Sequence, residues 1–348
     1  MLASIRRKSA RLLGCAAIGT ILVSVSLLAL AYFIPDRYGE SRGIARGLFA
    51  VAFFTRTFEM HLGLALLLPL ALLLWARRWR TACVAGSIVA WFLAPLIFSY
   101  VRSHDDLQSP PLRVMTANLL IGHAEVDALA EEVQRFSPDV LFLQEYTPAK
   151  AAALALALKD LYPHRVEGMR DHAFGEAIYS KIPFATEPEL YPHASIRGQG
   201  RLDGREGGEV GIWDAQIRAV INFHGTQIVL QNVHYAPPIR PAYLREQRIM
   251  TKWLCDWLRT EARPVIIAGD FNCTQSSVNL RDLERAGATN SRVASRGWAG
   301  TWPARGLPSL MPVAIDHVLV RGLKCRFSAP GSDIDSDHLP LTAIVGVR

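Results

Sequence analysis

The stretch Pro264-Val265-Ile266-Ile267-Ala268-Gly269-Asp270-Phe271-Asn272 decides the fold of the larger part of this chain. A short apolar run bounded by proline and by polar residues predicts a buried β-strand that ends at the edge of a sheet. Side chains at i and i+2 of a strand point the same way, so Asp270 and Asn272 are expected to face one spot while Phe271 turns into the core. An acid and an amide aimed at one point suit a phosphate or a water. A strand running into a capping turn would have the same sequence.

Three further apolar runs in the C-terminal part end in polar residues in the same way. They lie at 112–119, with Asn118 near the end, at 139–145, which closes with Glu145, and at 228–234, which closes with His234. The stretch 125–136 has the apolar spacing of an amphipathic helix, and 148–161 and 241–260 are predicted as two further helices between the strands. Strands that alternate with helices predict a layered α/β fold whose site lies where the buried strands end.

Each of these polar strand ends also has a plain structural interpretation. A carboxylate such as Glu145 suits Mg²⁺, which binds one or two carboxylates and keeps several waters. A salt-bridged strand end would look the same. Asp316 lies in the lead-in to a strand, and Asp337-His338 come just before the last strand. Any single Asp-His pair is weak evidence of a site.

A segment rich in glycine and arginine, 197–209, separates two of the predicted strands. Its arginines, Arg197, Arg201 and Arg205, are candidates to bind a phosphate or pyrophosphate. The alternative is a solvated flexible loop without a binding role.

Taken together, the motifs form an ordered set. They are Asn118, Gln144-Glu145, Asn232-Val233-His234, Gly269-Asp270-Phe271-Asn272, Ile315-Asp316-His317-Val318 and Ser336-Asp337-His338-Leu339-Pro340. The set resembles the endonuclease/exonuclease/phosphatase superfamily, and the resemblance covers about 111–348. It implies a DNase-I-like fold, a four-layer α/β sandwich of two sheets face to face with helices outside.

The resemblance also implies a role for each polar residue. Glu145 would hold the divalent metal, Mg²⁺ first and Mn²⁺ as the alternative, with Asn118 beside it and Asp337 contributing. Asp270 would orient or deprotonate the attacking water, and Asn272 would bond a phosphate oxygen. His338, held by Asp316, and His234 would stabilise the charge that develops on the phosphoryl oxygens.

Elementary chemistry supports a metal-dependent phosphoesterase independently. A phosphate ester is already negative, so its hydrolysis needs positive charge and oriented donors more than a protein nucleophile. A histidine paired with a carboxylate keeps a fixed tautomer and a raised pKa, which favours a cationic ring near phosphate. The sequence contains no GxSxG motif, and Cys273 follows Asn272 without an evident base.

The formal net charge of +7 lies entirely in the N-terminal region. Residues 1–109 hold 12 of the 38 Lys and Arg and 5 of the 31 Asp and Glu, so residues 110–348 hold 26 of each. A nuclease is expected to carry a basic face for the phosphate backbone, and the overall charge of the catalytic part gives no support for one. The five cysteines form no CxxC pair and predict neither a disulfide framework nor a zinc site.

The N-terminal region, 1–102, predicts three membrane-spanning helices, at 12–34, 58–76 and 81–101. The first run has 23 uncharged residues, enough at about 1.5 Å each to cross a hydrocarbon layer of about 30 Å. Basic clusters before the first helix and between the second and third place both in the cytoplasm. A linker at 103–111 then leads to the catalytic domain at 112–348, which is expected outside the cell inner membrane.

This placement favours a lipid partner. A tethered extracytoplasmic site meets lipid-linked phosphates at high effective concentration, whereas nucleic acid is the less favoured partner, and no protein partner can be inferred. The layout also resembles membrane-bound family members associated with teicoplanin resistance, which implies undecaprenyl pyrophosphate as a substrate. The expected function is hydrolysis of a phosphate ester or pyrophosphate of a lipid. The alternative is a membrane-tethered endonuclease or exonuclease.

Overall fold

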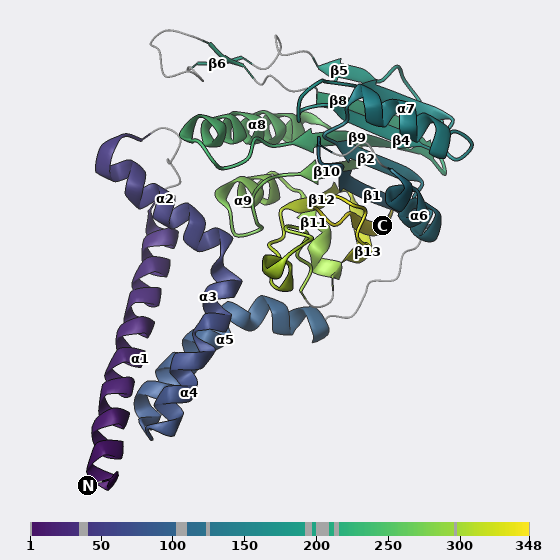
Figure 1. Cartoon of the computed structure of the whole chain (residues 1–348). Helices are drawn as coiled ribbons and strands as arrows, with labels where there is room; N and C mark the ends of the chain where they lie inside the picture. Colours follow the sequence, from purple (N-terminus) through teal and green to yellow (C-terminus); the bar gives the residue numbers. More distant parts are fainter. Residues whose placement is uncertain are drawn as a thin grey trace. The chain divides into compact units, whose positions relative to one another are not determined.

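The computed structural model describes residues 2–34, 41–101, 110–122, 126–191, 197–199, 209–211, 216–295 and 298–347. The chain divides into two compact units, residues 1–101 and 102–348, which are considered separately below (Figure 1).

All of the regular secondary structure in the described residues of the first unit is helical. Its helices are α1 (Leu2–Phe33), α2 (Gly43–Thr57), α3 (Glu59–Ala65), α4 (Leu67–Trp75) and α5 (Trp79–Val101). One helix is long and apolar enough to cross a membrane by itself, through its segment Leu12–Phe33 with a mean hydropathy of 2.3. A helix of this kind near the N-terminus is either a membrane span or a signal sequence.

The remaining helices of this unit differ from the sequence prediction. Helix α2 lies between the first and second predicted spans, where the sequence analysis assigned no helix. The second predicted span corresponds to α3 and α4. These two helices, Glu59–Trp75, follow α2 at an angle of 73°, and the bent pair would count as one further span. Over the fully described part of α5, the apolar stretch Trp79–Ala94 is shorter than a span. Three separate crossings therefore remain a prediction.

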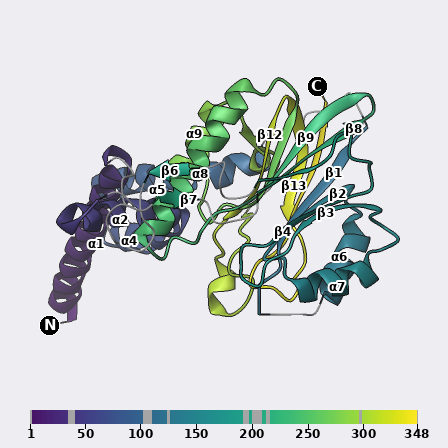
Figure 2. The same ribbon diagram turned by 90° about the horizontal axis from the view of Figure 1, so that it is seen from above.

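The second unit contains two six-stranded mixed sheets (Figures 1 and 2). The first has the order β13 (Leu323–Pro330), β14 (Leu341–Val347), β1 (Leu112–Asn118), β2 (Val140–Gln144), β4 (Glu176–Ser180) and β3 (His164–Gly168). The second has the order β11 (Thr289–Asn290), β12 (Asp316–Arg321), β10 (Val265–Asp270), β9 (Thr226–His234), β8 (Gln216–Phe223) and β5 (Glu189–Tyr191). A separate pair joins β6 (Arg197–Gln199) and β7 (Glu209–Gly211).

Helices cover the outer face of each sheet. Helices α6 (Asp127–Phe136) and α7 (Pro148–Ala157) pack on the first sheet, and α8 (Pro241–Thr260) and α9 (Val278–Arg285) pack on the second (Figure 2). Between the sheets lies an apolar core that includes Val114, Phe142, Ile178, Leu230 and Ile266, all fully buried. The arrangement is helix, sheet, sheet, helix, which confirms the predicted four-layer α/β sandwich.

Strand register brings the polar strand ends together. Strand β10 runs parallel to β9 with Asp270 opposite His234, and antiparallel to β12 with Asp270 opposite Asp316. In the other sheet β1 and β2 are parallel, with Asn118 opposite Gln144. Because the ends of parallel neighbours meet at one edge of a sheet, residues far apart in the sequence gather at one end of the sandwich.

Candidate active site

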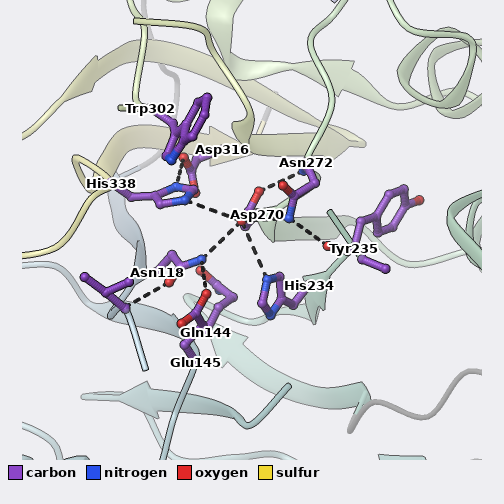
Figure 3. A network of polar contacts seen from close by, with 12 residues as sticks. Asn118, Gln144, Glu145, His234, Tyr235, Asp270, Asn272, Trp302, Asp316 and His338 are labelled. Carbon is purple, nitrogen blue, oxygen red and sulfur yellow. Dashed lines mark hydrogen bonds and ion pairs between the residues drawn. The ribbon is translucent and has the colours of Figure 1, made fainter. Parts of the chain in front are cut away.

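Asp270 is the centre of the polar network at this end of the sandwich (Figure 3). Its side chain is 1% exposed. One carboxylate oxygen, Oδ2, accepts from Asn118 Nδ2 at 3.1 Å and from Asn272 Nδ2 at 3.0 Å, and Oδ1 accepts from the Asn272 backbone N–H at 2.8 Å. The Nε2 atoms of His234 and His338 lie 3.6 and 3.8 Å from Oδ2. One acid thus contacts two amides and two imidazoles.

The relation between Asp270 and Asn272 differs from the strand geometry expected from the sequence. Strand β10 ends at Asp270, and Asn272 adopts a left-handed backbone with φ of 48°. The two side chains meet because the chain turns back, and the Asn272 amide is held by a further bond to the Tyr235 carbonyl at 2.8 Å. Phe271 points into the core, as predicted, and is fully buried.

Gly269 lets the two strands approach closely just before the acid. Its φ is +150°, and a Cβ at this position would lie 1.8 Å from the carbonyl oxygen of Val233 on β9. Only glycine fits such a contact without moving backbone. The glycine of the Gly-Asp-Phe-Asn motif therefore positions Asp270 beside His234.

Asp316 and His338 form a buried pair on the other side of Asp270. His338 Nδ1 lies 2.9 Å from Asp316 Oδ2, and the two residues are 5% and 1% exposed. Burial lowers the pKa of His338, but the carboxylates of Asp316 and Asp270 outweigh that effect and raise it to about 10. Burial likewise opposes ionisation of Asp316, yet the charge of His338 lowers its pKa. The pair is therefore an imidazolium and a carboxylate at neutral pH.

His234 differs from His338 in its charge state. Burial lowers its pKa to about 4, although the charge of Glu145 acts in the other direction. Its ring packs against Phe174, with the centroids 5.2 Å apart. His234 is therefore neutral at pH 7 and offers a hydrogen bond, not a positive charge. Burial also raises the pKa of Asp270, to about 8, against the influence of His338.

Glu145 and Asn118 form the second part of the site. Glu145 follows β2 in a left-handed conformation with φ of 55°, and it is half-buried. Its Oε1 accepts from Asn118 Nδ2 at 3.2 Å, and its Oε2 accepts from the Ile121 backbone N–H. The Asn118 amide oxygen accepts from Leu120 N at 3.1 Å. Asn118 thus links the carboxylates of Glu145 and Asp270.

The comparisons with known proteins agree with this arrangement. The sequence profile described as the Endonuclease/Exonuclease/phosphatase family matches residues 115–338, a range that includes every candidate site residue above. The chain belongs to this family. Members are metal-dependent phosphoesterases and nucleases, so the protein is an enzyme of the phosphoric ester hydrolase class. A search of the curated proteins gave no significant match.

Solved structures show the same fold at low sequence identity. TDP2 from D. rerio, complexed with single strand DNA product, is 19% identical and has a TM-score of 0.52, covering 68% of this chain and 99% of that chain. An endonuclease/exonuclease/phosphatase from Bacteroides vulgatus is 14% identical with a TM-score of 0.54, covering 69% and 100%. A functionally unknown conserved protein from Enterococcus faecalis V583 is 18% identical with a TM-score of 0.53, covering 68% and 100%. These likenesses concern the fold alone.

Two groups of side chains are candidates for the divalent metal that the family uses. The ligand atoms of Asp270, Asp316 and His338 lie within 4.8 Å of one another. However, the high pKa of His338 keeps a proton on both ring nitrogens, and a protonated imidazole has no lone pair for a metal. The half-buried carboxylate of Glu145 is the better fit, since Mg²⁺ takes one or two carboxylates and retains water. A metal held there would supply positive charge to a phosphoryl oxygen.

Asp337, the other predicted metal residue, is half-buried and lies in the loop before β14. Its Oδ2 accepts from the indole N–H of Trp302 at 3.1 Å. Ser336 donates to the Asn118 carbonyl at 2.8 Å, which fixes this loop to the end of β1. Asp337 therefore lies on the same end of the sandwich as Glu145. The metal roles of Glu145, Asn118 and Asp337 remain predictions.

Lys150 is a buried residue of the site that the sequence did not reveal. Its Nζ donates to the carbonyls of Leu119 at 2.6 Å and Glu145 at 3.4 Å, and also to that of Leu120. Burial lowers its pKa to about 8, while Glu145 and Asp337 act to raise it. Leu120, like Glu145, has a left-handed backbone. Lys150 ties together the two strand ends that carry Asn118 and Glu145.

Arg292 is a second cation that was missed. It lies in the 3-10 turn Ser291–Ala294, and its Nη2 donates to the Asp316 carbonyl at 3.2 Å. Its Nε faces His317 Nδ1 at 3.3 Å. Burial lowers the pKa of Arg292 to about 10, with Asp316 acting against this. The guanidinium stabilises the start of β12 and adds positive potential next to the Asp316–His338 pair.

A layer of amides beneath the site joins the two sheets. Gln144 Nε2 donates to Asn232 Oδ1 at 2.7 Å, and Asn232 Nδ2 donates to the carbonyls of Leu143 and Ala177 at 2.9 and 3.0 Å. All of these bonds are buried, so they fix the spacing of the sheets directly below the catalytic carboxylates. The Gln and Asn of the sequence motifs therefore support the site from below.

The predicted phosphate-binding arginines are not among the residues whose side chains are described. Arg197 begins strand β6, and Arg201 and Arg205 lie outside the described residues. Their role as substrate contacts remains a prediction.

Proposed function

We propose that this protein is a membrane-anchored, Mg²⁺-dependent hydrolase of a phosphate ester or pyrophosphate bond in a lipid or lipid-linked substrate, such as undecaprenyl pyrophosphate. The observation that carries the proposal is the occurrence, in one chain, of the apolar helix segment Leu12–Phe33 and a phosphoesterase site. A tether to the bilayer raises the effective concentration of lipid-borne phosphates around that site.

The charge of the catalytic part supports a lipid over a nucleic acid. Proteins that bind nucleic acid neutralise several phosphates with Lys and Arg, and this contributes most of their nonspecific affinity. Residues 110–348 carry equal numbers of basic and acidic residues. A lipid pyrophosphate presents only one small anionic group, which a few local donors and one metal ion can neutralise.

In the proposed reaction, water attacks phosphorus and the bond to the leaving oxygen breaks. Asp270, whose side chain is oriented by Asn118 and Asn272, accepts the proton of the attacking water in its ionised form. Because its pKa is raised to about 8, this form becomes the major one only above that pH. The imidazolium of His338, held by Asp316, donates to a phosphoryl oxygen as negative charge develops. Neutral His234 donates a further hydrogen bond. Glu145, which Asn118 links to Asp270, would hold the metal ion, and the ion would supply positive charge to a phosphoryl oxygen.

We place the catalytic part outside the cell inner membrane, with a multi-pass anchor. Basic residues precede the first apolar segment at 6–11 and recur at 77–80, and the positive-inside rule assigns such clusters to the cytoplasm. A C-terminal alkaline phosphatase fusion to the full chain tests this topology. The fusion is expected to be active, and an inactive but intact fusion would place the domain in the cytoplasm.

The substrate is tested with the purified full-length protein and Mg²⁺. Phosphate release from a polyprenyl pyrophosphate in detergent micelles is measured beside nicking of plasmid DNA. Lipid turnover that disappears in Asp270→Ala supports the proposal. DNA nicking that disappears in the same variant, without lipid turnover, would instead establish the membrane-tethered nuclease.

A further inference from the structure

An exposed apolar turn lies close to the active site. Leu307 and Leu310, at the two ends of the 3-10 turn Leu307–Leu310, are 85% and 80% exposed. The sequence from Gly306 to Ile315 contains no charged residue. Single water-exposed leucines are common on protein surfaces. Here, however, two highly exposed leucines are three positions apart in a 3-10 turn, so both side chains lie on the same side of it.

The turn is fixed to the rim of the site by its two ends. On one side Trp302, whose indole donates to Asp337, is paired with Val313 through backbone hydrogen bonds. Ala304 N donates to the Asp337 carbonyl at 2.8 Å. Arg305 forms an ion pair with Asp333 at 3.0 Å, in the same loop as Asp337. The two leucines are therefore held beside the catalytic loop by ordered contacts.

A third apolar side chain lies in the turn after β1, next to Glu145. Ile121 is 40% exposed, and its backbone N–H donates to Glu145, the residue that best fits the metal. Apolar groups thus adjoin the site both near Glu145 and near Asp337. A substrate that enters past them is expected to carry hydrocarbon next to its phosphate.

We propose that Leu307 and Leu310 insert into the surface of a phospholipid bilayer and hold the active site against the lipid head groups. This inference rests on the proposed lipid substrate and membrane anchor. We identify the partner of the turn as a membrane because the proposed N-terminal anchor keeps this domain close to one. Only nine peptide units separate Val101, at the end of α5, from Pro110, and at about 3.5 Å each they span at most about 30 Å. Leucines presented on a tethered domain partition into the interfacial region of the bilayer.

The first experiment separates docking from chemistry with full-length protein in nanodiscs. The variant carries Leu307→Ser and Leu310→Ser, and the control is Leu156→Ser, a leucine of α7 that is 79% exposed. Hydrolysis of a polyprenyl pyrophosphate in the disc and of soluble bis-p-nitrophenyl phosphate is measured for each. We expect the double variant to raise KM for the lipid about tenfold or more, with kcat and soluble hydrolysis unchanged. An unchanged KM for the lipid overturns the proposal.

A second readout does not depend on the substrate. Leu307→Cys and Leu156→Cys are labelled with a fluorophore in a chain whose Cys15, Cys83 and Cys325 are replaced by Ser. Nanodiscs containing a nitroxide-labelled phospholipid are expected to quench the label at 307 at least about twofold more than the label at 156. Equal quenching of the labels at 307 and 156 would refute contact between the turn and the bilayer. The same result is expected if a second copy of the chain covers the turn. Quenching at 307 without lipid hydrolysis by the unmutated chain would retain the docking surface and reject the lipid substrate.

Discussion

Replacing Asp316 with asparagine tests the charge assignment of the site. The difference between the ordinary pKa of histidine, 6.5, and the value of about 10 for His338 corresponds to about 5 kcal/mol at 1.36 kcal/mol per pH unit. A unit charge at the 2.9 Å separation of His338 and Asp316 contributes about 6 kcal/mol in an effective dielectric of about 20. Asp316→Asn keeps an acceptor for Nδ1 but removes the charge. The pKa of His338 is then expected to fall to about 7 or below.

The consequence is a loss of activity that depends on pH. At pH 9 the original enzyme keeps most of His338 protonated, whereas a pKa of about 7 leaves about 1% of it protonated, so kcat/KM is expected to fall about 100-fold. At pH 6 both forms are protonated and the loss is expected to stay below about tenfold. The assay is the pH profile of kcat/KM with a soluble phosphodiester and saturating Mg²⁺. The control is Asp282→Asn, which removes a carboxylate that pairs with Arg248 on α8.

Stability gives an independent check of the same assignment. Because the folded-state pKa of His338 is raised, its protonation stabilises the folded protein fully below pH 6.5, and this contribution is lost as pH rises through about 10. The gap in melting temperature between the original protein and Asp316→Asn should therefore narrow as pH rises from 6.5 to 10. A loss of activity that is equal at pH 6 and pH 9, with a constant gap, would refute the reasoning and leave Asp316 a purely steric role.

Three other predictions follow from the geometry. Glu145→Gln should weaken Mg²⁺ binding at least about tenfold in calorimetry, whereas Asp270→Asn should change the Mg²⁺ affinity by less than about twofold. A larger loss of affinity in Asp270→Asn than in Glu145→Gln would assign the metal to the Asp270 group. Asp270→Asn should lower kcat at least about 10³-fold at pH 8, and a smaller loss would exclude it as the base. Gly269→Ala should lower the free energy of unfolding by at least about 3 kcal/mol, because the new Cβ meets Val233 O. The control is Gly122→Ala, where a Cβ has nothing within 4 Å and the free energy of unfolding should change by less than about 1 kcal/mol. Chemical denaturation measures both.

Much of the site could be predicted because it is local to strand ends. The run that ends in Asp270 forms β10. This strand pairs along its whole length with the apolar strands β9 and β12, which fixes the register of all three. Once Asp270 is set beside His234 and Asp316, the motifs converge without further information. The turn at His224-Gly225 joins the two apolar strands β8 and β9, and Gly225 there has a left-handed φ of 84°.

The parts that could not be predicted depend on tertiary contacts. Lys150 and Arg292 have ordinary sequence surroundings, and only the fold shows that they are surrounded by backbone carbonyls close to the site. The left-handed turn at Asn272 was missed because strand alternation does not describe a chain that has just left its strand. Helix α2 was missed because its arginines, Arg46 and Arg56, interrupt the apolar runs by which spans were recognised.

The two histidines beside Asp270 show why residue type alone does not give a catalytic role. Their Nε2 atoms lie at nearly the same distance from the same carboxylate oxygen, 3.6 Å for His234 and 3.8 Å for His338. Both are buried, yet their pKa values are about 4 and about 10. The main difference is Asp316, which contacts the far nitrogen of His338, while His234 packs its ring on Phe174. One carboxylate at the start of β12 therefore keeps one imidazole protonated at neutral pH, while the other stays neutral. A phosphate bound between them would be polarised toward His338 and toward the metal ion that we propose at Glu145.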